Sequence, residues 1–161
     1  VYAEQRARQD GDSVATIGML NVPQGSINVV PGACHFSLDM RAPNDAQRDA
    51  LAHDILQHLR DICTARGVQC EWEETVRAAA APRDAGLQSR WENALAHLGL
   101  PIHRMPSGAG HDAMKLHHLL PQAMLFVRGE NQGISHNPLE CTTADDMQLA
   151  IDAFSLFMKD F

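Results

Sequence analysis

The sequence lacks the features that would indicate a nucleic-acid-binding or membrane protein. Its 161 residues carry a net charge of −7 and contain no run of five or more like charges, so no basic patch is available for a phosphate backbone or an anionic bilayer. No apolar stretch approaches the ~20 residues that a membrane-spanning helix needs, and the first ten residues have no apolar signal-peptide core. We therefore expect no nucleic-acid partner, no membrane span and a cytoplasmic location.

Cysteine is scarce and scattered. The four cysteines, Cys34, Cys63, Cys70 and Cys141, include no C-x-x-C spacing, which excludes a zinc knuckle and a thioredoxin-like motif. We expect free thiols, buried or half-buried, in a reducing compartment.

Two β-rich segments and one long amphipathic helix dominate the first half. Residues 13–22 are rich in strand-forming side chains, and residues 34–41 alternate between apolar and polar ones, which predicts two strands. Asn44 or Asp45 can cap the following helix, which Gly67 ends. One face of this helix carries Leu51, Ile55, Leu59 and Ile62.

Shorter patterns flank these segments. Residues 2–9 have helical spacing without a preceding capping residue, which predicts the end of a longer helical segment, and residues 68–78 predict a third strand. The order strand, strand, helix, strand favours an α+β layer in which the helix covers an antiparallel sheet.

The second half has a different order of predicted helices and strands. We expect a domain boundary at the small-residue stretch 79–82. Beyond it, the spacing predicts a helix over 86–98, a buried strand over 123–127 and a last helix capped by Thr143 and Asp146. Alternating helix and strand indicates the edge of an α/β sheet, so the fold class we expect is α/β (α+β).

The first candidate site is the glycine-rich loop Gly110-His111-Asp112, which opens a predicted helix reaching about Leu119. Glycines let the backbone approach a ligand, and a helix N-terminus offers free N–H groups to an anion. The alternative is that His111 and Asp112 merely cap the helix.

The second candidate is the loop around His136, which follows the predicted strand 123–127. A histidine held between Gly133 and Pro138 at the end of a strand has the placement of many metal ligands, and Glu140 could orient it. A single histidine is not a metal site, so the alternative of a solvated histidine stays open.

The third candidate is the pair Asn28 and Arg41. A guanidinium fork and a carboxamide can jointly hold a substrate carboxylate. The alternative is a structural ion pair of Arg41 with one of three nearby carboxylates, those of Asp39, Asp45 and Asp49.

Three separated motifs resemble one protein family along essentially the whole chain. They are GSINVVPGACHFSLDMRAPN (25–44), MPSGAGHDAM (105–114) and MLFVRGENQGISHNPLECTTADD (124–146). Together they resemble the amidase/hydantoinase/carbamoylase group of the aminoacylase-like dinuclear metallopeptidases, which includes allantoate amidohydrolases, N-carbamoyl-L-amino-acid hydrolases and β-ureidopropionases.

The resemblance implies a domain layout and residue roles. Residues 1–80 would be the lid, or dimerisation, domain, and residues 81–161 the last segment of the catalytic domain. His136 would be a metal ligand, Asn28 and Arg41 would bind the substrate carboxylate, and His111 would lie near the active centre.

The resemblance also implies a reaction that needs more than this chain. Two divalent ions, zinc or manganese with cobalt or nickel as further options, would activate a water molecule that hydrolyses a ureido C–N bond and releases ammonia and carbon dioxide. The family's other four metal ligands and its general-base glutamate belong to a segment that this chain does not contain. A lid histidine that contacts substrate would also lie upstream of Val1.

Substrate and partners are expectations of the same kind. The FVRGENQGISHNPLE region favours allantoate over an N-carbamoyl amino acid, although Gln132 stands where relatives commonly carry glycine. The expected partners are a small ureido acid and a second copy of the chain, joined through the lid. The alternative of another class is a dimerisation module without catalysis.

Overall fold

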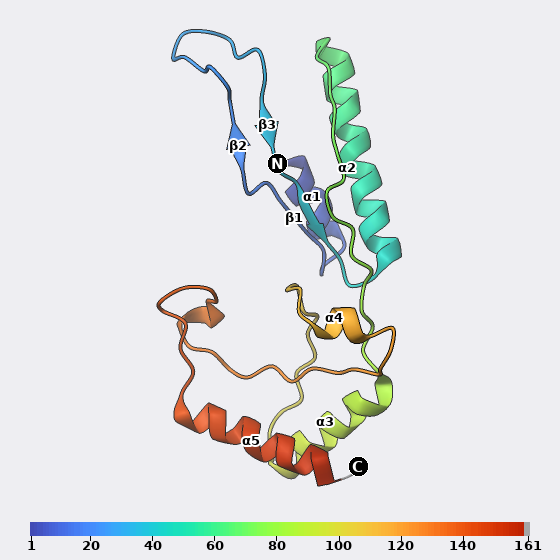
Figure 1. Cartoon of the computed structure of the whole chain (residues 1–161), viewed down its shortest axis with the longest axis vertical. Coiled ribbons are helices and arrows are strands. Elements are labelled where there is room, and N and C mark those ends of the chain that lie inside the picture. The colour runs from blue at the N-terminus through green and yellow to red at the C-terminus, as the bar shows by residue number, and fades with distance from the viewer. Residues whose placement is uncertain (160–161) are drawn as a thin grey trace. The chain divides into compact units, whose positions relative to one another are not determined.

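The chain forms two compact units. The computed structural model describes residues 1–159 (Figure 1). The first unit comprises Val1–Ala80 together with Pro106–Gly110, and the second comprises Ala81–Met105 and the residues from His111 onward. Both combine helices with small antiparallel pairs of strands or extended segments, consistent with the α/β class expected from the sequence.

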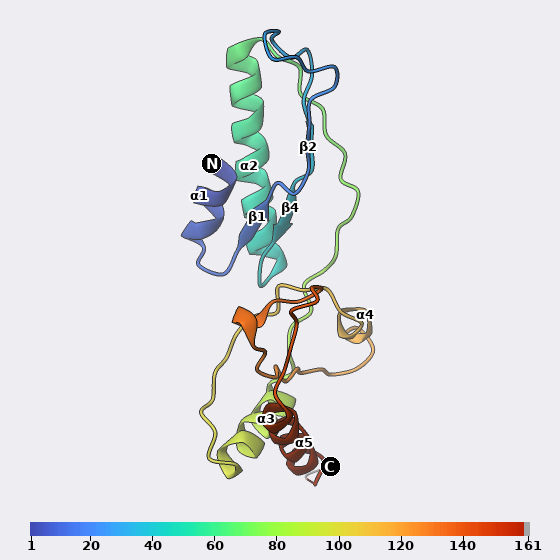
Figure 2. The same ribbon diagram turned by 90° about the vertical axis from the view of Figure 1, so that its left-hand side faces the viewer.

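The first unit is built on a long β-hairpin and two helices (Figure 2). Strand β1 (Val14–Thr16) pairs antiparallel with β4 (Asp39–Arg41), and β2 (Leu20–Asn21) pairs antiparallel with β3 (His35–Phe36). The two predicted strands are therefore present but each is interrupted. Ser37 N–H donates to Met19 C=O at 3.1 Å and continues the hydrogen bonding between the two pairs.

Both helices of this unit have the bounds that the sequence predicts. Helix α1 spans Tyr2–Gln9 and α2 spans Asp45–Arg66. Asn44 accepts a hydrogen bond from Gln47 N–H at 2.9 Å, and Gly67 ends α2 in the left-handed conformation with φ +65°. Local capping chemistry fixes both ends of α2.

The core of this unit lies between α1, α2 and the β1–β4 pair. Ala7, Leu51 and Ile55 are buried, and Leu38 and Met40 pack against them. Ile62, in the second half of α2, is 40% exposed. The predicted apolar face of α2 is therefore buried only where the hairpin and α1 reach it.

Leu51 should be the most sensitive core position. Its side chain is 0% exposed, so Leu51→Ala removes buried methyl groups and leaves a cavity. We expect a loss of about 2–5 kcal/mol in the free energy of unfolding, measured by urea denaturation followed by circular dichroism. Ile62→Ala, at a half-exposed position of the same helix, is the control and should cost less than half as much.

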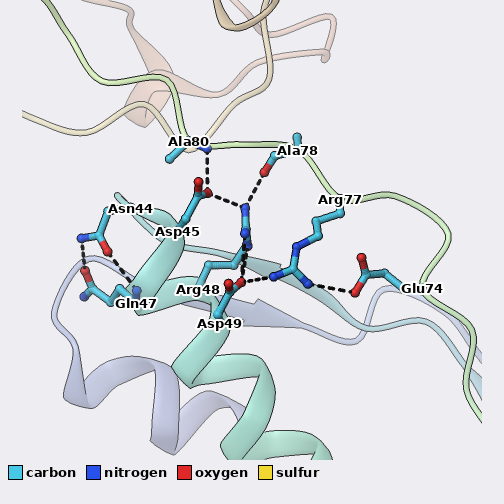
Figure 3. Close-up of polar contacts among 9 residues, drawn as sticks. All are labelled: Asn44, Asp45, Gln47, Arg48, Asp49, Glu74, Arg77, Ala78 and Ala80. Carbon is cyan, nitrogen blue, oxygen red and sulfur yellow. Dashed lines mark hydrogen bonds and ion pairs between the residues drawn. The ribbon is translucent and has the colours of Figure 1, made fainter.

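The third strand predicted at residues 68–78 is wrong. This segment is extended, but no residue in it makes ladder hydrogen bonds within the described part of the chain. It contacts α2 through side chains instead. Near its end, Arg48 bridges Asp45 and Asp49 and donates to Ala78 C=O, while Asp45 accepts from Ala80 N–H at 2.8 Å (Figure 3). Arg77 adds an ion pair to Asp49 at 2.6 Å.

The second unit, as far as residue 159, contains three α-helices and one turn of 3-10 helix. They are α3 (Ala85–His97), α4 (Ala113–Leu116), η1 (Asn131–Gly133) and α5 (Ala144–Lys159). Trp91 of α3 stacks on Phe157 of α5 with ring centroids 4.1 Å apart. Thr143 accepts from Asp146 N–H at 3.0 Å and donates to its carboxylate, which confirms the predicted cap of α5.

Two predictions for this unit need correction. The helix after the glycine-rich loop ends at Leu116 rather than about Leu119. Residues 123–127 form no strand, and Phe126 is 49% exposed, because no neighbouring strand among the described residues pairs with this segment.

The thiols are free, as expected, but not all are covered. Cys63 and Cys70 are half-buried, whereas Cys34 and Cys141 lie exposed outside regular elements. No helix among residues 1–159 has the length and apolar character to cross a bilayer.

Candidate functional site

The loop of residues 130–141 is held in a closed conformation by its own backbone. Glu130 N–H donates to Cys141 C=O at 2.8 Å and closes the loop at its base. The Asn131 side chain donates across the loop to Leu139 C=O at 2.7 Å. At this base, the hydrogen bond from the Cys141 thiol to the Glu130 carboxylate raises the pKa of that thiol. The loop that carries His136 is therefore ordered by its own contacts.

Left-handed backbone conformations make this loop turn sharply. Asn131, Gln132 and Gly133 have φ values of +50°, +64° and +70°, and His136 has +56°. Asparagine and glycine tolerate this region, whereas other L-residues pay a steric cost because Cβ approaches the neighbouring carbonyl oxygen. Gln132 and His136 carry that cost.

Replacing Gln132 by glycine should stabilise the second unit. Relief of the left-handed strain outweighs the added entropy of an unfolded glycine, so we expect the free energy of unfolding to rise by roughly 0.5–1 kcal/mol in urea denaturation. Gln88→Gly is the matched control: Gln88 lies in α3, where glycine should cost about 1 kcal/mol. A loss at Gln132 equal to that at Gln88 would contradict this account.

His136 is exposed and held through its backbone. Its N–H donates to the Glu140 carboxylate at 2.9 Å. The sequence suggested that Glu140 could orient the imidazole. In the structure the Glu140 carboxylate instead accepts the hydrogen bond from the His136 main chain. Glu140 therefore fixes the left-handed conformation from which the imidazole projects.

One imidazole can fill one coordination position of a metal ion. Within residues 1–159 the structure gathers no group of three His, Cys, Asp or Glu side chains suited to holding a cation. The described residues of this chain alone therefore do not form a metal centre, and His136 fits only as one ligand among others.

His111 lies half-buried at the start of α4 in the same unit. Its C=O accepts from Met114 N–H at 3.0 Å, and the C=O of Asp112 accepts from Lys115 N–H at 2.8 Å. The Asp112 side chain makes no capping hydrogen bond. The alternative interpretation of this motif, that its side chains cap the helix, thus does not hold for Asp112.

Arg41 ends strand β4 in the first unit, and its guanidinium group makes hydrogen bonds to other groups of this unit. Its Nε donates to Asp39 at 2.7 Å, its second terminal nitrogen donates to the same carboxylate at 3.1 Å, and the remaining one donates to Gly108 C=O at 2.6 Å. The guanidinium lowers the pKa of Asp39, through the hydrogen bond first, and the carboxylate raises the pKa of Arg41. Both side chains are about half exposed, so the pair itself contributes little stability.

Asn28 and Arg41 lie at opposite ends of the hairpin. Arg41 is paired with Val14, whereas Asn28 lies in the turn beyond the pair of Asn21 and His35, where Ser26 donates to its side chain at 3.2 Å. Arg41 follows His35 by six residues along β3, β4 and the two residues between them, and at about 3.3 Å for each extended residue this is roughly 20 Å. Within one copy of the chain the two side chains cannot hold the same carboxylate.

Several contacts around these candidates were not predicted from the sequence. They are the Gly108 carbonyl on Arg41, the Glu140 carboxylate on the His136 backbone and the hydrogen bond from Leu139 N–H to the Asn137 side chain at 3.0 Å. Asn-Pro is a common turn-initiating pair, so the turn at Asn137 had a local signal. The other two contacts depend on the folded loops.

Solved structures share this fold. An amidase of the hydantoinase/carbamoylase family from Burkholderia multivorans matches 98% of this chain, with a TM-score of 0.89 and 27% sequence identity, over 39% of its own length. A Bacillus subtilis protein described as a dinuclear metal-binding peptidase of the M20 family has the same fold with a TM-score of 0.67 at 19% identity.

The sequence itself gives the family. It matches Peptidase family M20/M25/M40 over residues 2–160, and the chain belongs to that family. It is 35% identical to an N-carbamoyl-L-amino acid amidohydrolase of Geobacillus stearothermophilus over 89% of this chain. It is also 35% identical to allantoate deiminase 1 of Glycine max over 91% of this chain. The chain spans about a third of each relative, 35% and 32% of their lengths.

Proposed function

We propose that this chain is part of a metal-dependent amidohydrolase that cleaves a ureido or carbamoyl C–N bond and releases ammonia and carbon dioxide. Support comes from the family match over residues 2–160 and from two relatives named for such reactions. The observation that carries the proposal is the ordered loop that projects the His136 imidazole from a left-handed backbone position. Strained backbone positions cluster at functional sites, which favours a catalytic role for this exposed histidine.

Among substrates we favour allantoate, with an N-carbamoyl-L-amino acid or a β-ureido acid as the alternative. The two relatives have equal identity to this chain although their names refer to different substrates. The preference therefore rests on the sequence of the His136 loop.

The residues of this chain take two roles in the proposal. His136 would hold one of about two divalent ions, and Arg41 and Asn28 would bind the carboxylate at the far end of the substrate. A bound divalent cation lowers the pKa of a coordinated water and polarises a carbonyl. Arg41 would exchange its bonds to Asp39 for bonds to the substrate carboxylate, which offers the same planar geometry to the guanidinium.

We further propose that the complete enzyme is a homodimer through the first unit. Asn28 and Arg41 are roughly 20 Å or more apart in one copy, so a shared carboxylate would need Asn28 from one copy and Arg41 from another. Sedimentation velocity at high concentration tests this, and a strictly monomeric, active enzyme would contradict it.

The test of the activity compares this chain with a version extended upstream by the N-terminal segment of the Geobacillus stearothermophilus relative. Metal content after dialysis and ammonia release from allantoate and an N-carbamoyl amino acid are measured on both, after circular dichroism has established folding. We expect the extended form alone to retain about two metal ions and to turn over. A folded extended form that neither binds metal nor turns over would favour the alternative of a dimerisation module.

A further inference from the structure

Two cysteines lie where the chain reverses direction at the end of α2. Gly67 adopts the left-handed conformation, Gly67 N–H donates to Thr64 C=O at 3.2 Å and Val68 N–H donates to Cys63 C=O at 2.9 Å. This is the double hydrogen bond of a Schellman motif. It directs the residues after Val68 back over the last turns of the helix.

The directions of the side chains then place the thiols of Cys63 and Cys70 next to one another. Arg60 and Cys63 are three residues apart in α2 and share a helix face, while Cys70 and Trp72 are two residues apart in an extended segment and share a side. The Trp72 ring lies 4.4 Å from the Arg60 guanidinium, which fixes how the two faces meet. Cys70 consequently faces Cys63, and both are half-buried.

The electrostatic environment agrees with this juxtaposition. Burial of the Cys70 thiol raises its pKa, and its hydrogen bond with Cys63 raises it further. Both effects favour the neutral thiol of Cys70, and neither cysteine belongs to the loops proposed for catalysis.

We propose that Cys63 and Cys70 are a reversible redox site that closes to an intramolecular disulfide when a small-molecule disulfide such as oxidised glutathione is the oxidant. One cysteine thiolate attacks the glutathione disulfide, forming a mixed disulfide and releasing one glutathione thiol. The second cysteine then displaces the other glutathione. In total, the two S–H groups lose two protons and two electrons, one S–S bond forms, and the oxidant becomes two glutathione thiols.

The closed form would attach the segment after α2 at a second point. Its far end is already held by Arg48 and Asp45, which bind the main chain at Ala78 and Ala80 (Figure 3). Its near end is held by the main-chain hydrogen bond of Val68 to Cys63 and by the contact of Trp72 with Arg60, and it makes no ladder hydrogen bonds among the described residues. A disulfide at Cys70 would fix this near end on the helix.

The experiment equilibrates the folded whole chain with oxidised and reduced glutathione, blocks free thiols with N-ethylmaleimide and digests with trypsin. Cleavage after Arg60, Arg66 and Arg77 places the two cysteines in separate peptides, 61–66 and 67–77. We expect the two peptides to be linked by a disulfide, with a mass two hydrogen atoms below the sum of the free peptides. The rate of linking should increase as the pH rises toward the pKa of the thiols. In concentrated urea the equilibrium for closure should be about tenfold less favourable, because the folded chain holds the thiols together.

Matched variants separate this site from the other cysteines. Cys34→Ser combined with Cys141→Ser should leave the linked peptides unchanged, since both thiols are exposed elsewhere. Cys70→Ser should leave Cys63 as a mixed disulfide or a free thiol. The proposal is overturned if Cys63 and Cys70 carry only separate glutathiones, or if closure is equally favourable in urea. The readout involves no catalytic activity, so it fails or succeeds independently of the amidohydrolase assignment.

Discussion

Replacing His136 by alanine should remove one metal ion and most of the activity of the extended enzyme. The imidazole is the one group of this chain that we assign to a metal, and loss of a residue that merely supports a metal ligand already costs 10–100-fold. We expect kcat to fall by at least about 100-fold and the metal content after dialysis to fall from about two ions to about one.

The control for His136 is another exposed histidine of the same unit. His97 ends α3 and its ring nitrogen contacts Asn93 C=O at 2.8 Å, so His97→Ala should leave metal content and kcat within a few-fold of the parent. If His136→Ala retains both metal ions while losing activity, the imidazole acts on substrate rather than on a metal. If it retains both metal and activity, the assignment of the site is wrong.

Arg41→Ala should lower kcat/KM of the extended enzyme by roughly 30- to 1000-fold. The estimate corresponds to about 2–4 kcal/mol for removing one partner of a charge-assisted pair. Arg41→Lys should recover little of it, because an ammonium cannot donate the paired, planar hydrogen bonds of a guanidinium. The measurement is kcat/KM for an N-carbamoyl amino acid and for its carboxamide, which lacks the charge that Arg41 would bind.

The carboxamide separates substrate binding from a structural role. If Arg41 binds the carboxylate, Arg41→Ala should scarcely change kcat/KM for the carboxamide. If Arg41 only supports the loop at Gly108, through its 2.6 Å hydrogen bond to that carbonyl, kcat/KM should fall equally for both substrates. Arg8, which is exposed on α1 and paired with Glu4, is the control position, and Arg8→Ala should change neither value.

Helix ends were predictable because their determinants are local. Asn44 and Gly67 frame α2, and Thr143 with Asp146 opens α5, each through hydrogen bonds within a few residues. A strand depends on a neighbour that can lie anywhere in the sequence. This is why the segments 68–78 and 123–127 were predicted as strands although neither pairs with another among the described residues.

For the candidate site, the sequence offered residue types suited to the chemistry but not their arrangement. The sequence pointed to Asn28, Arg41, His111 and His136 as chemically suitable groups. It could not reveal that the hairpin register separates Asn28 from Arg41, because register is set by pairing across the turn. The Cys63 and Cys70 contact was equally hidden, since it depends on the chain reversal after Gly67.

The left-handed run around His136 restricts which amino acids this stretch of the chain can accept. At Asn131 and Gln132 the backbone conformation admits glycine, asparagine and aspartate and disfavours valine, isoleucine and threonine, whose branched Cβ atoms collide with the main chain. Sequence drift at these two positions is therefore limited by steric fit, even though their side chains are solvent-exposed. In a saturation mutagenesis library, the amino acids accepted at these two positions should be those that can adopt a positive φ, and burial and charge should matter less.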